Sequence, residues 1–347
     1  MRQAGFFDVD RRLEAISAKG DPLETINAAV RWEDFRGTIE AVTETRPEER
    51  KSNAGRKSYD TILKFKMVVL QALYNLSDEQ LEFQVRDRLS FMRFLGLDLH
   101  DPVPDATTIW LFREALVRAA KIDELFKRFN RHLEAKGYIA RGGQIIDASI
   151  VEVPKQRNTR EENATVKAGN TPEELEKQPA KNAQNDKDAR WTKKNGKSFY
   201  GYKNHVGVDK THKIIRTWDV TNASVHDSQK LDDILDANNT GRKVWADSAY
   251  RSAEIEAKLK AKGLKSCVHY KGVRGRPLSE KEKAENTARS EVRARVEHVF
   301  GHQTNSMGDK IVRTIGTARA RFKIGMMNLG YNMRRLVQLR RMAAASA

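Results

Sequence analysis

Two short apolar stretches that each carry an aspartate decide the fold of this chain: residues 144–151, QIIDASIV, and residues 243–247, KVWAD. Both are rich in β-branched or aromatic side chains, which favour β-strands. We place Asp147 and Asp247 at the ends of these strands. Sites in open α/β sheets form at the carboxyl ends of strands, so two such strands would bring two carboxylates together. A single aspartate after a strand is more often a turn residue or a helix cap, so only the pair carries the prediction.

The segments around these strands predict a mixed sheet flanked by helices. Residues 199–208 alternate as a strand, 209–212 form a turn and 213–220 return as a second strand. Helices are expected at 228–235 and 252–259, and another strand at 264–270. This order is similar to that of ribonuclease-H-like α/β domains, and we assign it to residues 141–335. Two polar stretches, near 154–198 and 271–288, are expected to be insertions, loops or segments ordered by a ligand.

Residues 1–140 are expected to form an all-helical N-terminal domain. Helical periodicity begins at Tyr59, Ser77 begins a capping box, Asp105 caps a later helix, and Gly137 ends the last one. Two capped helices are compatible with a DNA-binding helix-turn-helix, and equally with a plain helical bundle. Residues 336–347 are expected to be a basic C-terminal tail.

The charge of the chain points to a polyanionic partner. Its 347 residues include 64 Lys or Arg against 47 Asp or Glu, a net charge of +17. The single cysteine excludes an intramolecular disulfide and a cysteine-based zinc cluster, and it fits a reducing cytoplasm. We find no signal peptide and no apolar run of about 18 residues, so nucleic acid is a better partner than a membrane.

A third acid, Glu297, lies in an amphipathic helical stretch at residues 289–300. It borders the apolar face made by Val292, Val296 and Val299, from where it could point towards the sheet edge. Three bare carboxylates would repel each other, and a pair of hard divalent cations removes that conflict. Oxygen ligands suit Mg²⁺, with Mn²⁺ as a substitute, and two such ions can support an in-line phosphoryl displacement.

Several motifs in this order resemble bacterial DDE transposases of the insertion-sequence-5 group. They are QIIDASIVE, DARWTKKNGKSFYGYKNHVGVD, TNASVHDS, VWADSAYRS and ARVEHVFG, preceded by the helical stretch that begins SYDTILKFK. The resemblance covers most of residues 58–335. It implies a ribonuclease-H-like catalytic domain with Asp147, Asp247 and Glu297 as metal-binding catalytic residues. It also implies cutting of double-stranded DNA at the ends of a mobile element, joining of those ends to target DNA, and a homodimer on DNA in the bacterial cytoplasm and nucleoid.

The helical signature of that group is only half present. Arg293 lies one turn before Glu297 and matches it, whereas Ser290 and Thr304 occupy the positions of its Tyr and Lys. The resemblance therefore implies a DNA-binding role for Arg293. It implies no DNA contact for Ser290 and Thr304, because these residues differ from the Tyr and Lys of the group.

We assign further DNA contacts to a stretch that interleaves basic and aromatic residues. Trp191, which we place outside the strand, Lys193, Lys194, Lys203 and His205 belong to it. This mixture suits stacking on unpaired bases beside phosphate binding, although aromatic residues of such a strand can be plain core. Residues 289–347 add twelve Lys or Arg against three Asp or Glu, next to the proposed catalytic acid.

Other acids have simpler interpretations. Asp209 reads as a turn former, Asp227 as a helix cap and His226 as a packing or capping residue, whereas Asp219 could face the site. The sequence thus predicts a DNA transposase. The alternatives are a nuclease or resolvase of the same fold without strand transfer, and a DNA-binding regulator without chemistry.

Overall fold

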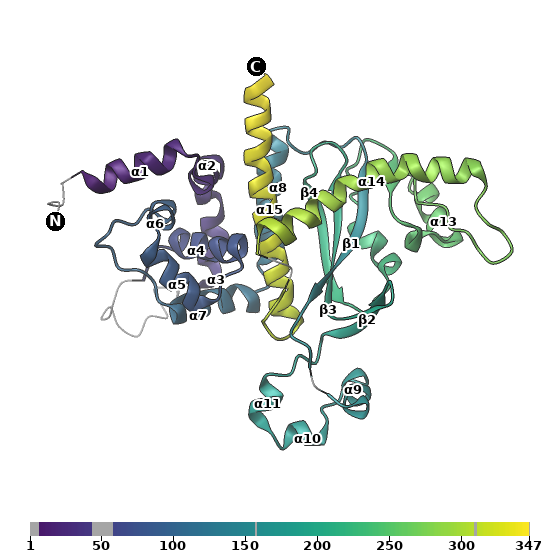
Figure 1. Cartoon of the computed structure of the whole chain (residues 1–347), viewed down its shortest axis with the longest axis horizontal. Helices are drawn as coiled ribbons and strands as arrows, with labels where there is room; N and C mark the ends of the chain where they lie inside the picture. The colour runs from purple at the N-terminus through teal and green to yellow at the C-terminus, as the bar shows by residue number, and fades with distance from the viewer. Residues whose placement is uncertain (1–6, 44–57, 157, 309–310, 347) are drawn as a thin grey trace. The chain divides into compact units, whose positions relative to one another are not determined.

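The computed structural model describes residues 7–43, 58–156, 158–308 and 311–346 (Figure 1). It divides the chain into two compact units. One comprises Met1–Lys136 together with Met326–Ala347, and the other comprises Gly137–Gly325. The long C-terminal helix α15, Thr317–Ser346, therefore contributes residues to both units.

The described part of the first unit is helical. Its helices are α1 Asp8–Ala18, α2 Pro22–Ala29, α3 Arg36–Thr43, α4 Thr61–Tyr74, α5 Asp78–Asp87, α6 Leu89–Leu95, α7 Ala106–Arg118 and α8 Ile122–Ala135. The expected caps are confirmed: Ser77 and Gln80 form a capping box, and the Asp105 carboxylate accepts from the Thr108 amide at 2.6 Å. The helix α4 is buried on almost all sides, as its broad apolar pattern predicts.

Aromatic side chains make the centre of this core. The Phe35 and Phe65 ring centroids lie 4.9 Å apart, and Trp32 meets Phe94 edge-on at 5.5 Å. Residues of α15 complete the unit, since Asn332 donates to the Asn130 side chain and Leu336 is fully buried. The expected tail at 336–347 is therefore wrong for its described residues, which continue α15 as far as Ser346.

The helix α6 was not expected as a separate element. The backbone becomes extended at Arg88, with φ −109° and ψ 113°, and this ends α5 without a proline or glycine. Consequently α6 stands between the two capped helices α5 and α7 that a helix-turn-helix interpretation would pair.

The second unit contains a six-stranded mixed sheet with the order β2-β3-β1-β5-β6, and β4 also pairs with β3. The strands are β1 Gln144–Glu152, β2 Arg190–Lys194, β3 Lys197–Asp209, β4 Ile215–Asn222, β5 Lys243–Trp245 and β6 Lys265–Ser266. β1, β2 and β4 run antiparallel to β3, whereas β5 is parallel to β1 and to β6. The mixed sheet with flanking helices agrees with the sequence prediction, although β6 is shorter than the expected strand at 264–270.

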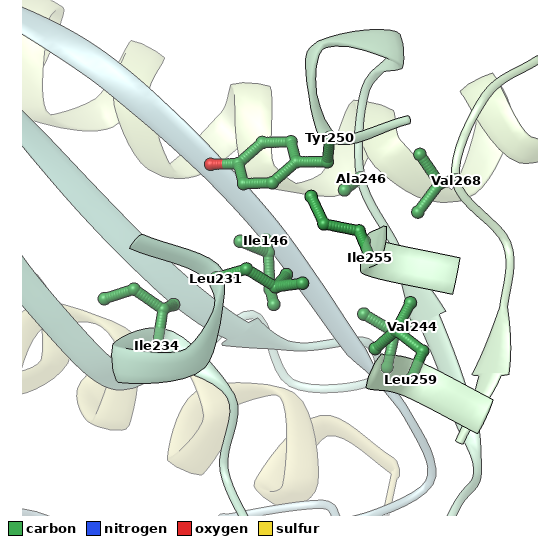
Figure 2. Packing of buried hydrophobic residues seen from close by; sticks show 9 residues of the cluster. All are labelled: Ile146, Leu231, Ile234, Val244, Ala246, Tyr250, Ile255, Leu259 and Val268. Carbon is green, nitrogen blue, oxygen red and sulfur yellow. The ribbon is translucent and has the colours of Figure 1, made fainter. Parts of the chain in front are cut away.

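Alternate residues of β1 face opposite sides of this sheet. Ile146 packs into a core with residues of α12 (Leu231–Ile234) and α13 (Ala253–Ala261), shown in Figure 2. The next residue, Asp147, faces the other side, where α14, Glu280–Ser306, packs against β1 and β5. The α14 face of the sheet therefore carries the predicted site.

The two polar stretches are more ordered than their composition suggests. Residues 158–194 contain α9 Arg160–Lys167, α10 Glu173–Glu176, α11 Pro179–Ala183 and the edge strand β2. Asp186 ties this insertion to the sheet, because its buried carboxylate accepts from the Tyr202 hydroxyl at 2.9 Å. The second polar insertion is shorter than the expected range near 271–288, because Ser279 caps α14 and the helix begins at Glu280.

Candidate active site

Asp147 lies in the middle of β1, whereas the sequence pattern predicts it at the end of the strand. It is 6% exposed, its Oδ1 accepts from the Ala148 amide at 2.8 Å, and its Oδ2 accepts from Arg293 Nη2 at 2.7 Å. β1 continues beyond Asp147 because its antiparallel partner β3 extends along its whole length. The parallel partner β5 ends at this level, so Asp147 still lies at the carboxyl edge of the parallel part of the sheet.

Asp247 follows β5 by two residues and is level with Asp147. The register pairs Ile145 with Trp245, so each aspartate lies two residues beyond a paired position on adjacent parallel strands. The Asp247 carboxylate accepts from the Ala249 amide at 2.8 Å and caps the short 3-10 helix Ser248–Tyr250. Asp247 thus combines the capping role common for such an aspartate with a position next to Asp147.

The electrostatics of Asp147 reflect its surroundings. Burial raises the pKa of its carboxyl group, the Arg293 guanidinium opposes that shift, and the negative charge of Asp247 adds to it. A buried carboxylate beside a second acid is costly unless a cation neutralises it. In this structure Arg293 supplies the cation.

Glu297 is on α14, one turn after Arg293, and is exposed. Val296 and Val299 are buried as predicted, together with Phe300, whereas Val292 is half-buried. Residues four apart lie on the same side of a helix, so Glu297 and Arg293 share the side of α14 that reaches β1. Across the described ranges, no three His, Cys, Asp or Glu side chains are grouped to hold a metal ion. The three-acid site therefore stays a prediction, with Asp147, Asp247 and Arg293 brought together and Glu297 nearby on the helix.

Two residues without an assigned role lie close to these acids, His269 beside β5 and Tyr250 in the core on the Ile146 side of the sheet. His269 is aligned beside β5, its amide donating to the Ala246 carbonyl, and its Nε2 lies 3.4 Å from the Ser290 hydroxyl. Burial, followed by the charges of Arg293 and Arg289, lowers the pKa of His269, and Asp247 opposes the shift. No motif in the sequence marked His269, because only the pairing of the β6 region with β5 brings it close.

Tyr250 is the second such residue. It is 1% exposed, its hydroxyl has no hydrogen-bond partner among the residues that the structure describes, and Figure 2 shows the ring among apolar side chains of the core. Burial and then the charges of Asp227, Asp147 and Asp247 raise the pKa of this phenol well above its ordinary value. The position of Tyr250 three residues after Asp247 is the only signal that could have indicated it.

The predicted DNA-binding residues fall into two environments. Trp191, Lys193 and Lys194 are exposed on the edge strand β2. Trp191 therefore lies outside the expected strand at 199–208, as predicted, but on a strand of its own that was not expected. Lys203 is largely buried, with its ammonium group 2.8 Å from Asp227 and bonded to the Val225 carbonyl. His205 is fully buried and its Nε2 lies 2.8 Å from the Thr221 hydroxyl. In this conformation neither Lys203 nor His205 offers a free surface to DNA, and their DNA role stays a prediction.

The competing acids have structural partners. Asp209 accepts hydrogen bonds from the amides of Thr211, His212 and Ile214, which confirms it as a turn former. Asp219 pairs with Lys230 and Arg321. The capping prediction for Asp227 is wrong: His226 accepts from the Ser228 amide and caps the short helix, whereas Asp227 pairs with Lys203.

Comparison with protein families identifies both parts of the chain. The family described as "Transposase DDE domain" matches residues 140–333, and that described as "Transposase domain (DUF772)" matches residues 11–115. The chain belongs to the DDE transposase family, and its class of activity is that of an insertion-sequence DNA transposase. No solved structure matches the chain. Across the described residues, every helix is too short or too polar to cross a bilayer.

Proposed function

We propose that this transposase cuts DNA at terminal inverted repeats and joins the 3′ ends to target DNA by metal-dependent phosphoryl transfer. The observation that carries the proposal is the level placement of Asp147 and Asp247 on adjacent parallel strands, within a chain of this family. The strand arrangement supports a ribonuclease-H-like domain, because three antiparallel strands, β4, β3 and β1, are followed by the parallel strands β5 and β6. We place the chain in the insertion-sequence-5 group from the motifs quoted above.

Two of the three acids that we assign to the metal site, Asp147 and Asp247, lie where they can bind a hard divalent ion together. Two carboxylates of Asp147 and Asp247 are oxygen ligands that Mg²⁺ or Mn²⁺ prefers, and Asp147 is desolvated beside a second negative charge. We assign Asp147, Asp247 and Glu297 to hold two ions, with Glu297 reaching the site after side-chain movement. When bound, the ions activate the attacking hydroxyl and neutralise charge on the leaving oxygen.

The residues of the chain then position the DNA. Ser290 and His269 lie beside the acids, where they are available to hydrogen-bond a phosphate or a water. Both ends of the mobile element have to be joined to the same target DNA. The two DNA ends therefore have to be held together during the reaction. We therefore propose a homodimer on DNA, acting in the bacterial cytoplasm and nucleoid.

The β2–β3 hairpin supplies a second contact with DNA. Trp191 pairs with Tyr200 on β3 and Asp147 pairs with Val206, so the two side chains lie on the same face of the sheet. The six-residue offset along β3 corresponds to about 20 Å at roughly 3.4 Å per residue. That separation matches about six base-pair steps of a duplex, at roughly 3.4 Å per step. The hairpin therefore suits contact with DNA to one side of the cut.

The first prediction tests the acids. Asp147→Asn, Asp247→Asn and Glu297→Gln should each lower strand cleavage at least about 100-fold, because each removes a charged ligand, while DNA binding is retained. The measurement uses a duplex that carries the terminal repeats flanking the gene, with Mg²⁺ or Mn²⁺, and EDTA should abolish the reaction. Glu291→Gln is the matched control, since Glu291 is another exposed acid on α14.

The products separate the alternatives. Cleaved ends that are also joined to target DNA are expected, whereas cleavage without joining would indicate a nuclease or resolvase. Binding without any metal-dependent turnover would indicate a regulator. Full activity in all three acid variants would show that the assigned residues are wrong.

A further inference from the structure

Both carboxylate oxygens of Asp147 are engaged within the protein. Oδ1 accepts from the Ala148 amide, and Oδ2 accepts from Arg293 Nη2 at 2.7 Å. The two side chains are 9% and 17% exposed, so this ion pair is largely removed from water. An ion that binds Asp147 through Oδ2 therefore has to compete with the guanidinium group.

Within the described part of the chain, Arg293 Nε is buried without a hydrogen-bond partner, and the guanidinium group is anchored to the sheet through its bond to Asp147. A guanidinium group and a divalent cation repel each other when they share one carboxylate. Release of Arg293 would leave it on the side of α14 that also carries Glu297, next to Ser290, with five N–H donors available for a phosphate.

We propose that Arg293 is a positioning residue that exchanges between Asp147 in the ion-free protein and a DNA phosphate in the loaded complex. This inference rests on the proposed function, because it assumes that Asp147 holds a divalent ion. Its consequence is that the ion and DNA bind cooperatively. DNA that draws Arg293 away frees Asp147 for the ion, and an ion on Asp147 frees Arg293 for DNA.

Thermodynamic linkage makes this coupling reciprocal, so it is measurable from both sides. Ca²⁺ is a suitable probe, since it is a hard oxygen-binding ion. In the wild-type protein, a duplex carrying the terminal repeat should tighten Ca²⁺ binding about tenfold or more, and Ca²⁺ should tighten duplex binding by the same factor. Calorimetry measures the first and fluorescence anisotropy measures the second.

Arg293→Gln isolates the exchange. Without its competitor, the ion should bind the DNA-free protein about tenfold more tightly than in wild type, and the added effect of DNA should shrink by a similar factor. Arg295→Gln is the matched control, because it removes a positive charge from the same helix. The Arg295 side chain bonds to the Lys210 carbonyl instead, so Ca²⁺ binding should change little.

Several outcomes decide the question. Ca²⁺ binding to Arg293→Gln that is no tighter than to wild type, while Asp147→Asn abolishes it, would overturn the exchange and leave the proposed function standing. If Asp147→Asn leaves Ca²⁺ binding intact, the metal site itself is wrong and both fail. Should the glutamine variant not fold, a crystal structure of wild type with Ca²⁺ and duplex decides: Arg293 on a phosphate supports the exchange, and Arg293 still on Asp147 overturns it.

Discussion

Single residues of the sheet interior show how burial tunes charge in this protein. Asp147 is paired with the charged Arg293, whereas His205 is fully buried and, among the described residues, has no charged hydrogen-bond partner. The Nε2 atom of His205 lies next to the Thr221 hydroxyl, and its Nδ1 atom has no hydrogen-bond partner in the described ranges. A neutral imidazole fits this environment, and a protonated one would carry an uncompensated buried charge.

The pH dependence of stability should report His205. Burial lowers its pKa to about 4 in the folded protein, and the neighbouring charges of Asp227, Lys203, Asp219 and Lys230 act in both directions. The unfolded chain takes up the proton below a pKa of about 6.5, so the folded state loses stability as the pH falls from about 6.5 towards 4. The loss between pH 7 and pH 5 should be about 2 kcal/mol.

His205→Gln removes this term while the other titrating groups stay in place. Urea unfolding at pH 7 and pH 5 should therefore show a fall in the free energy of unfolding that is about 2 kcal/mol smaller for the variant. Equal falls in both proteins would show that His205 does not resist protonation.

At the scale of elements, the β2–β3 hairpin presents charge at the edge of the sheet. Its turn, Asn195-Gly196, has positive φ at both residues, 51° and 79°, which is the geometry of a tight two-residue hairpin. Trp191 is 41% exposed and packs against Tyr200 with ring centroids 5.1 Å apart. Lysines on an edge strand also discourage sheet-to-sheet aggregation, so exposure alone does not establish a DNA role.

Variants of the hairpin separate these roles. Trp191→Ala should weaken binding to DNA that carries unpaired bases at its end about tenfold without changing its salt dependence, because stacking is lost and no charge changes. Lys193→Gln with Lys194→Gln should instead reduce the slope of log affinity against log salt by about two.

Lys260→Gln serves as the control for this pair, since Lys260 is exposed on α13. Anisotropy titrations over a range of salt concentrations measure all of these changes. Hairpin variants that bind like wild type while aggregating more readily would assign the lysines to edge protection.

At the scale of the whole molecule, the net charge of +17 sets the interaction with DNA. If six to ten lysines and arginines contact phosphates, affinity should fall about 10³- to 10⁵-fold between 50 and 200 mM salt. Binding measurements over that range test this. A nearly flat dependence would show that the excess charge is not used on phosphates.

Much of the architecture was predictable because it is encoded by neighbours in sequence. The capping box at Ser77, the Asp209 turn and the β3 and β4 strands on either side of that turn depend on residues a few positions apart or on simple periodicity. The break at Arg88 was missed because no proline or glycine marks it. The order within the polar insertion was missed because its short helices lack an apolar run, although the capping box of Thr159 and Glu162 and the proline at the start of α11 were signals for them.

Local pattern was enough to predict the strands other than β2 and the acids that stand on or beside β1 and β5. The packing of distant elements then made Arg293, 146 residues away along the chain, the partner of Asp147, and brought His269 close to the same site. It also decided that Lys203 and His205 lie inside the protein. The physical reason is that strand periodicity and helix caps are local, whereas the partner of a buried charge depends on which distant elements pack together.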